Sequence, residues 1–541
     1  MDLELPPVGE SERTPLVMAL LAIIDALRSR VQTLEETVQK LRDEIAILKG
    51  EKPKPKIAPS QLEKPKPKPR ADGEKRPGSA KRSKKAVALL EAEEIIVLCP
   101  DAPAGSTSKG YEPYDVQELV ISGKLTRYLR ERIQLPDGQT LLAPLPADVI
   151  PGSHFGPILI AYILSQHHQC NVTQPLLLEQ LLEWGIEISA GQLSRILTEG
   201  KDVFHQEKAD ILKAGREVSP YIGVDDTGAR HDGKNGYCTA ISNDLFAYFE
   251  STDSKSRVNF LKVLRGDCRG YVINDMALEY WKKQKMPQEW LEKLSAGLTH
   301  FVGDQAWQAY LSELGLAERL VKTATEGALL GVLIELGVSP DLMVLSDGAQ
   351  QFEMFVHASC WVHIERPLAR IIPHNEAHRE AIEQVRQQIW ELYKDLKEYR
   401  EKPDPAAKAS LEARFDALAG QQTIYTTSIG HVLKEMRDYR ADLLRVLERP
   451  EVPLHNNGTE SDIRCYVKTR KISGSTRSDD GRRCRDTFTS LKKTCRKLGV
   501  SFWAFLVDRI EGLEQIPLLP DLIRQKAREA ASPSPAQAVP A

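Results

Sequence analysis

The feature of this sequence that most constrains its fold is a change of hydrophobic period between residues 220 and 266. Three short runs rich in β-branched and aromatic residues come first, at 220–230, 235–242 and 245–252. Their length and composition are typical of strands. Residues 254–266 then carry Val258, Leu261 and Leu264 at the spacing of one helical face. The region therefore predicts three antiparallel strands followed by a helix.

Three such strands, a helix and then further strands are how a ribonuclease H-like α/β core begins. A core of this kind carries one carboxylate on its first strand, a second at the end of its fourth strand and a third on a later helix. Asp225, in the run PYIGVDDTGAR, suits the first position. An acid within an apolar strand more often caps a turn than binds a metal, so Asp225 alone does not identify a site.

Two aspartates compete for the second position. Asp275 ends the β-like run in GYVINDMALEYW, and Asp347 ends the one in DLMVLSDGAQQF. Spacing favours Asp275, which follows Asp225 by 50 positions. Asp347 is followed closely by HASCWVHIERPLARI, and this neighbouring stretch favours it. Spacing leaves both alternatives open.

The stretch HNNGTESDIRCYVKTRKISG supplies the third candidate, Glu460. Thr459 and Asp462 predict a capping box, which places Glu460 in the first turn of a helix. A basic strip follows on that helix: Arg464, Lys468, Arg470 and Lys471. A carboxylate beside a cationic surface is what a phosphodiester substrate requires. A plain surface salt bridge is the alternative interpretation.

The first segment of the chain has a heptad pattern. β-Branched residues and leucines alternate as two sets: Ile24, Val31, Val38 and Ile45; and Leu20, Leu27, Leu34, Leu41 and Leu48. β-Branched residues at one core position with leucine at the other favour a parallel two-stranded coiled coil. Residues 16–50 therefore predict a homo-oligomer, the alternative being an amphipathic helix docked on its own domain.

Residues 51–86 read as a linker that is expected to be disordered. Lys-Pro repeats give an extended chain that cannot bury a core. Thirteen Lys and Arg against four acids would attract a polyanion without reading its sequence. A soluble spacer explains the same composition.

The regions on either side of the predicted core complete the domain plan. Residues 87–150 alternate short apolar runs with Gly, Pro and Asp, which predicts a small β-rich module. Residues 151–205 predict a helix-turn-helix-like segment with its turn at Gly185. The core itself is expected at 215–373 and 451–515, interrupted by a helical insertion at 374–450 that Pro403 and Pro405 divide. Residues 516–541 are expected to be a disordered tail.

The cysteines and the N-terminus indicate a compartment. Eight scattered cysteines without a CxxC pair are typical of reduced thiols in a cytoplasmic protein. The N-terminus is acidic, unlike a signal peptide. The apolar run at 16–27 is shorter than the roughly 20 residues that span a bilayer. We therefore expect a cytoplasmic protein, not bound to a membrane.

At this point the sequence resembles the IS66-family transposases. The resemblance rests on three blocks in order: VDDTGAR, SDGAQQF with the following CWVHIER, and HNNGTESDIRCYVKTRKISG. The coiled-coil start and the run GPILIAYILSQH resemble the family's amino-terminal half, so the resemblance covers most of residues 16–510. The Cys360–His363 block favours Asp347 over Asp275 as the second carboxylate.

The resemblance implies a DDE transposase with Asp225, Asp347 and Glu460 as catalytic and metal-binding residues. Two Mg²⁺ or Mn²⁺ ions would activate the attacking water or 3′-hydroxyl and stabilise the leaving oxygen. The partners implied are DNA, as terminal inverted repeats and target, and accessory proteins of the same element. The protein would be associated with the nucleoid. Arg464, Lys468, Arg470 and Lys471 would contact DNA.

The sequence departs from the family in two regions. About ninety residues, 252–341, separate the third predicted strand from DLMVLSD, more than a compact core needs, which keeps Asp275 as an alternative. The family often carries a four-cysteine zinc module before the helical segment, whereas here that region holds only Cys99. We therefore expect no zinc, and interpret 87–150 as a remnant of the module. Two rival functions remain: a DNA-binding protein that has lost catalysis, and a nuclease on the same core that cuts without joining.

Overall fold

The structure is a computed structural model of the chain. It describes residues 118–146, 149–150, 152–373 and 375–531, with scattered single positions nearer the N-terminus. The predicted coiled coil at 16–50 lies outside the described residues except at positions 16, 17, 30, 31 and 34, which are helical. The linker at 51–86 lies wholly outside them.

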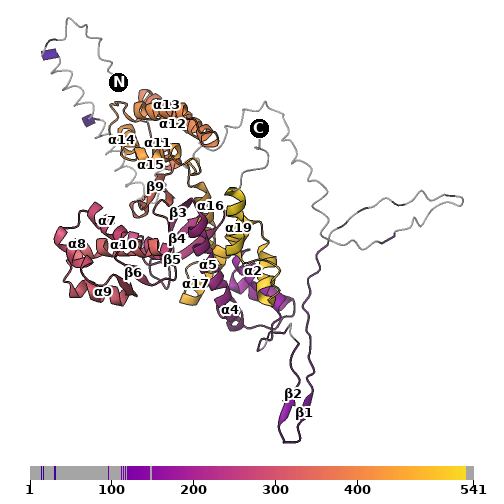
Figure 1. Ribbon diagram of the computed structural model, residues 1–541. Coiled ribbons are helices and arrows are strands. Elements are labelled where there is room, and N and C mark those ends of the chain that lie inside the picture. The colour runs from indigo at the N-terminus through magenta and orange to yellow at the C-terminus, as the bar shows by residue number, and fades with distance from the viewer. Residues whose placement is uncertain are drawn as a thin grey trace, which may run out of the picture. The chain divides into compact units, whose positions relative to one another are not determined.

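A mixed five-stranded sheet forms the centre of the fold (Figure 1). Its strands are β3 (Tyr221–Gly228), β4 (Tyr237–Ser242), β5 (Ala247–Thr252), β8 (Met343–Ser346) and β9 (Val356–Ser359), in the order β5-β4-β3-β8-β9. β3, β4 and β5 are antiparallel, whereas β8 runs parallel to β3 and to β9. The predicted α/β core with three antiparallel strands is confirmed.

Helix α17 (Asp479–Leu498) covers the outer edge of β5. The main-chain N–H groups of Ala247, Phe249 and Ser251 donate to side chains of α17: Thr494 Oγ1 at 3.1 Å, Ser490 Oγ at 2.9 Å and Asp486 Oδ2 at 2.8 Å. An open edge strand exposes unpaired N–H groups that invite pairing with another chain. These polar residues of α17 satisfy that edge and so close the sheet on one side.

An inserted α/β lobe separates the third and fourth strands of the sheet. It follows α6 (Arg257–Arg265) and contains β6 (Gly270–Val272), α7 (Asp275–Lys283), α8 (Gln288–Ser295), β7 (His300–Val302), α9 (Asp304–Glu313) and α10 (Glu318–Glu335). Among the described strands, β6 pairs only with β7, in a two-stranded sheet. Most of the segment between β5 and β8 thus forms a separate sheet with its helices, and α10 packs on α6 and α7.

A second insertion, after β9, is helical. It contains α11 (Trp361–Arg370), α12 (Glu376–Glu401), α13 (Pro405–Ala419), α14 (Ile429–Asp438) and α15 (Arg440–Leu443), around a hydrophobic cluster of its own. α12 ends before Pro403, and α13 begins at Pro405, where proline suits the first helical turn. The chain then returns to the sheet through α16 (Asn457–Ser473).

The segment before the sheet is helical, with α2 (Pro157–His168), α3 (Gln174–Glu183), α4 (Ala190–Thr198) and α5 (Asp202–Val218). Gly185, at φ 75°, makes the turn between α3 and α4. Ser189 caps α4, accepting from Gln192 N while its own N–H donates to the Gln192 side chain. The helix–turn–helix arrangement is therefore present, and its reading of DNA is still a prediction.

The two ends of the described chain differ from expectation. The predicted disordered tail contains α19 (Leu519–Ala531), because Leu519 and Ile523 are fully buried and the helix packs on α5. α18 (Phe502–Glu511) precedes it. In the predicted β-rich module, the described strands are a short exposed hairpin of β1 (Arg132–Gln134) and β2 (Thr140–Leu142). Among the described residues, no helix is long and apolar enough to span a membrane.

Candidate active site

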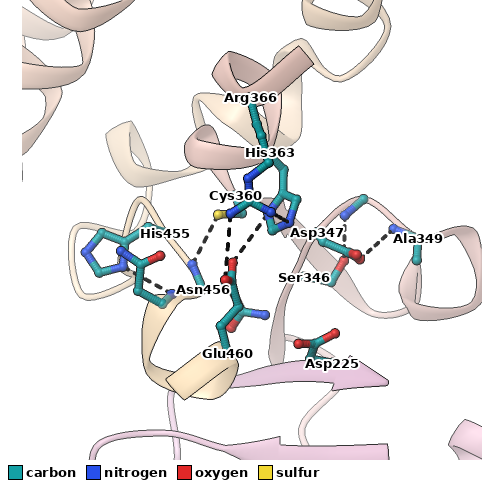
Figure 2. Close-up of polar contacts among 12 residues, drawn as sticks. Asp225, Ser346, Asp347, Ala349, Cys360, His363, Arg366, His455, Asn456 and Glu460 are labelled. Carbon is teal, nitrogen blue, oxygen red and sulfur yellow. Dashed lines mark hydrogen bonds and ion pairs between the residues drawn. The ribbon is translucent and has the colours of Figure 1, made fainter. Parts of the chain in front are cut away.

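Strand register brings Asp225 and Asp347 to the same level of the sheet. In the parallel pair, Gly223 lies opposite Leu345. Asp225 and Asp347 each follow these partners by two residues, Asp225 within β3 and Asp347 directly after β8. Figure 2 shows their carboxylates beside one space, which Glu460 also enters from α16. The structure thus brings together the three acids proposed from sequence.

Glu460 reaches this space because the start of α16 lies directly on β3 and β4. Asn456 Nδ2 donates to the carbonyl of Val224 at 2.8 Å, and Ser242 Oγ donates to Thr459 Oγ1 at 3.0 Å. Gly223 makes the approach possible: a Cβ there would lie 2.2 Å from Thr459 Oγ1 and 2.6 Å from Asn456 Oδ1. The sequence pattern gave no signal for this requirement.

The predicted capping box at this helix is wrong, although Glu460 does lie in the first turn. Asn456 is the N-cap, and it makes no side-chain cap hydrogen bond. Thr459 is buried and bonded to Ser242, while Asp462 pairs with Lys493 at 3.3 Å and Lys497 at 2.8 Å. Contacts with the sheet and with α17 therefore engage the two side chains that would have formed the box.

Crowding of the acids changes the acidity of Asp225. Burial raises the pKa of this carboxyl from 3.8 to about 7, and the neighbouring charges of Asp347 and Glu460 add to the effect. Carboxylates that repel one another in a partly buried place favour protons or cations among them. The charges of Asp347 and Glu460 therefore lie close enough to Asp225 to add to the rise in its pKa.

Asp226, the second acid of the VDDTGAR block, makes hydrogen bonds within the fold. Its Oδ1 accepts from Thr239 Oγ1 at 2.6 Å and its Oδ2 accepts from Gln351 Nε2 at 3.2 Å. Successive side chains of a strand point to opposite faces, so two adjacent acids cannot both face the space beside Asp347. This alternation separates the roles of Asp225 and Asp226.

Positively charged and polar groups surround Glu460, whose side chain is 12% exposed. Arg464 Nη2 donates to Glu460 Oε2 at 3.1 Å, and Arg366 Nη2 lies 3.7 Å from the same oxygen. On the other side, His363 Nδ1 lies 3.7 Å from Glu460 Oε1. The Arg464 side chain is 73% exposed and can leave this contact without disturbing the fold.

A buried hydrogen-bond chain, which sequence reasoning missed, supports the end of β8. Ser346 Oγ and His357 Nε2 are 2.8 Å apart, and His357 Nδ1 lies 2.8 Å from Asp442 Oδ2. Ser346 is fully buried and cannot act as a nucleophile on a substrate. Its hydroxyl accepts from Gly348 N at 3.1 Å, which shapes the turn that carries Asp347. The chain links this turn to α15 of the helical insertion.

The predicted DNA-contacting strip is only partly free. Arg464, Lys468 and Lys471 are exposed along α16. Arg470 is half-buried, with Nη1 close to Gly228. Two further cations of the region, Lys493 and Lys497, are paired with Asp462. Three of the four predicted side chains are therefore placed where a polyanion can reach them.

Asp275 is not part of the acidic group. It lies exposed in the first turn of α7, directly after the inserted strand β6. Because β6 pairs with β7 and not with the central sheet, the strand end at Asp275 is separate from those of β3 and β8. The structure thus distinguishes the two aspartates that spacing left open.

Two comparisons with known proteins bear on this arrangement. A family described as "Transposase IS66 family" matches residues 343–483, the stretch that contains Asp347, the helical insertion and Glu460. The chain is also 38% identical over 314 residues to the uncharacterized protein y4jO of Sinorhizobium fredii. That alignment covers 57% of this chain and 97% of the relative.

Proposed function

The chain belongs to the IS66 family of transposases, and from this premise we propose that it cuts the ends of a DNA element and joins them to target DNA. The observation that carries the proposal is the grouping of Asp225, Asp347 and Glu460 beside strands β3 and β8. The order β5-β4-β3-β8-β9, with three antiparallel strands followed by two parallel ones, supports a ribonuclease H-like core.

The donor set fits a hard divalent cation. All three groups are carboxylates, which Mg²⁺ and Mn²⁺ prefer as ligands. The raised pKa of Asp225 supports this assignment, because acidic neighbours in a partly buried place favour a cation among them. Two bound ions would supply activation of the attacking oxygen and stabilisation of the leaving oxygen at phosphorus.

The protein's own residues hold and orient this group. Asn456, Thr459 and Gly223 fix the first turn of α16 against the sheet, so Glu460 faces the two aspartates. Ser346 and His357 hold the turn that carries Asp347. Arg464 balances Glu460 and is exposed enough to turn to a DNA phosphate. These contacts position acids in advance, which is how such sites gain rate.

A groove beside α16 supports a continuous DNA surface. It has a volume of about 750 Å³ and lies between the helix–turn–helix segment and the α16–α17 region. Its lining includes Thr173, Ser194, Ser475, Arg477 and Arg485. Hydroxyls and arginines are the side chains that most often contact phosphate and sugar. We propose that the terminal inverted repeat lies here, with a second subunit, joined through the N-terminal heptads, holding the other end.

The test uses the purified full chain with end-labelled element DNA and Mg²⁺. A transposase releases the 3′ ends and also yields products joined to a target plasmid. Cleavage without joined product would favour a nuclease on the same core. Binding without either reaction, in Mg²⁺ and in Mn²⁺, would favour a DNA-binding protein that has lost catalysis.

A further inference from the structure

A second set of possible metal ligands shares Glu460 with the acidic group. Among the described residues, Cys360, His363 and Glu460 form a cluster whose ligand atoms all lie within 4.8 Å of one another. Cys360 directly precedes α11, His363 lies in the first turn of α11, and Glu460 lies in the first turn of α16. Two helix N-termini, both favourable to anionic groups, therefore meet at this place.

Two polar atoms of the cluster are buried and have no hydrogen-bond partner within the described part of the chain: His363 Nδ1 and Glu460 Oε1. They face each other at 3.7 Å, which is too long for a hydrogen bond. Buried polar atoms in native proteins are nearly always satisfied, and exceptions call for a bound ion or a functional reason. A cation between the two atoms satisfies both.

The distances suit a tetrahedral ion of the zinc type. With bonds of about 2.0–2.1 Å to nitrogen and oxygen, a tetrahedral ion separates two such ligands by about 3.4 Å. The observed 3.7 Å needs only a small closure. Cys360 Sγ already accepts from Asn456 N at 3.3 Å, so the sulfur is oriented toward the start of α16. A thiolate with an imidazole selects zinc-like ions and not Mg²⁺.

Arg366 opposes the metal-bound form. Its Nη1 lies 2.9 Å from His363 Nε2, and a guanidinium can only donate, so Nε2 accepts and the ring proton is on Nδ1. An ion on Nδ1 would move that proton to Nε2, which could then no longer accept from Arg366. The Arg366 side chain is 28% exposed and has room to turn away.

From this geometry we propose that Cys360, His363 and Glu460 form a site for Zn²⁺ or a similar ion, which withdraws Glu460 from the acidic group and so restrains Mg²⁺-dependent cleavage. Binding stands on the ligand geometry alone, whereas the restraint rests on the proposed function. The proposal departs from the expectation that the protein binds no zinc, and the site is distinct from the family's four-cysteine module, because its ligands come from the β9–α11 junction and from α16.

Binding is tested with Co²⁺ on the full chain, kept reduced with a phosphine. The expected result is a saturable cobalt–thiolate charge-transfer band that Zn²⁺ removes. Cys360→Ser should abolish the band, and His363→Gln should weaken Co²⁺ binding at least about tenfold. Cys268→Ser, which changes a half-buried cysteine elsewhere, should leave it unchanged. Absence of the band in the wild type, or its persistence in Cys360→Ser, overturns the proposal.

Arg366→Gln gives a test that misfolding cannot imitate. The glutamine oxygen can accept from Nε2–H, the tautomer that the metal-bound form needs, and the opposing charge is removed. Co²⁺ affinity should therefore rise about tenfold, the size expected of a group that supports a metal ligand. Equal or weaker binding by this variant would count against the assigned ligand atom.

The restraint is measured as cleavage with Mg²⁺ after adding Zn²⁺, each protein being compared with its own zinc-free rate. Zn²⁺ should inhibit cleavage by the wild type and by Cys268→Ser equally. It should inhibit Arg366→Gln at a lower zinc concentration. If Co²⁺ binds as described but the wild type never cleaves, the proposed function is wrong and the metal site stands. If the wild type cleaves but no cobalt band appears, the metal site is wrong and the function stands.

Discussion

Asn456 donates its side-chain amide to the carbonyl of Val224 at 2.8 Å, one residue before Asp225. This contact ties the start of the helix that carries Glu460 to the strand that carries Asp225. The two acids are more than two hundred positions apart in the sequence, so their mutual placement depends on this docking. The first prediction concerns this hydrogen bond.

Asn456→Ala should destabilise the protein by about 1–3 kcal/mol, since it leaves the buried Val224 carbonyl without its partner. The rate of Mg²⁺-dependent cleavage should fall by more than the loss of folded protein explains, because the helix turn that carries Glu460 loses its hydrogen bond to β3. Urea unfolding and cleavage at saturating DNA measure the two effects. The neighbouring Asn457→Ala is the control. Equal behaviour of the two variants would show that Asn456 has no special docking role.

The acidic group should respond as a unit. Glu460→Gln keeps the shape of the side chain but removes the charge that holds a cation. Cleavage and joining should each fall at least about a thousandfold, which corresponds to roughly 4 kcal/mol. Asp225→Asn and Asp347→Asn should do the same, with binding to the inverted repeat retained.

Asp275→Asn is the matched control for this series, since Asp275 lies on the inserted lobe. It should leave both reactions unchanged. Loss of activity in Asp275→Asn with activity spared in Asp347→Asn would reassign the second carboxylate. Full activity in Glu460→Gln would reduce that residue to a salt-bridge partner of Arg464.

The raised pKa of Asp225 predicts a pH dependence of stability in the metal-free protein. The folded protein holds this proton up to about pH 7, whereas an ordinary aspartate releases it near 3.8. The free energy of unfolding therefore falls as the pH rises between these values. The share of Asp225 is at most about 4 kcal/mol, and less after solvent screening.

Urea unfolding in EDTA at pH 5 and pH 8 measures this effect. Relative to the wild type, Asp225→Asn should be more stable at pH 8 than at pH 5, because the variant carries no charge to bury. Mg²⁺ should stabilise the wild type at pH 8 and have little effect on the variant. An identical difference at both pH values would mean that Asp225 does not titrate in this range.

Gly223→Ala should disturb the same docking from the strand side. Its Cβ would collide with Thr459 Oγ1 and Asn456 Oδ1, both on buried residues that cannot easily move. We expect a loss of about 1–3 kcal/mol in the free energy of unfolding, the usual cost of overpacking. Gly458→Ala, with nothing within 4 Å of its Cβ, is the control and should not destabilise α16. Thermal unfolding compares the two.

The exposed cations of α16 should contribute to DNA binding through phosphates. Arg464→Ala, Lys468→Ala and Lys471→Ala should each reduce the slope of log affinity against log salt by about one. Arg470→Ala should change the slope less, because that side chain is half-buried beside Gly228. Arg414→Ala on α13 is the control for an exposed arginine elsewhere. An unchanged slope in all three variants would place the DNA on another surface.

Local pattern was enough to predict several elements of this protein. Hydrophobic period predicted β3, β4, β5 and the following helix, and the paired prolines predicted the break between α12 and α13. Residue chemistry drew attention to Asp225 and Glu460. These features depend on neighbours a few positions away, whose side chains share one face of a strand or helix.

Tertiary structure decided which elements meet. β6 and β8 have similar apolar runs ending near an aspartate, yet only β8 pairs with β3, and this pairing brings Asp347 rather than Asp275 beside Asp225. Tertiary contacts also decided the roles of Thr459 and Asp462. Their sequence pattern predicts a capping box, but Thr459 bonds to the sheet and Asp462 pairs with α17. A strand's period says which face is buried but not which strand lies beside it, because partners are chosen by packing over the whole chain.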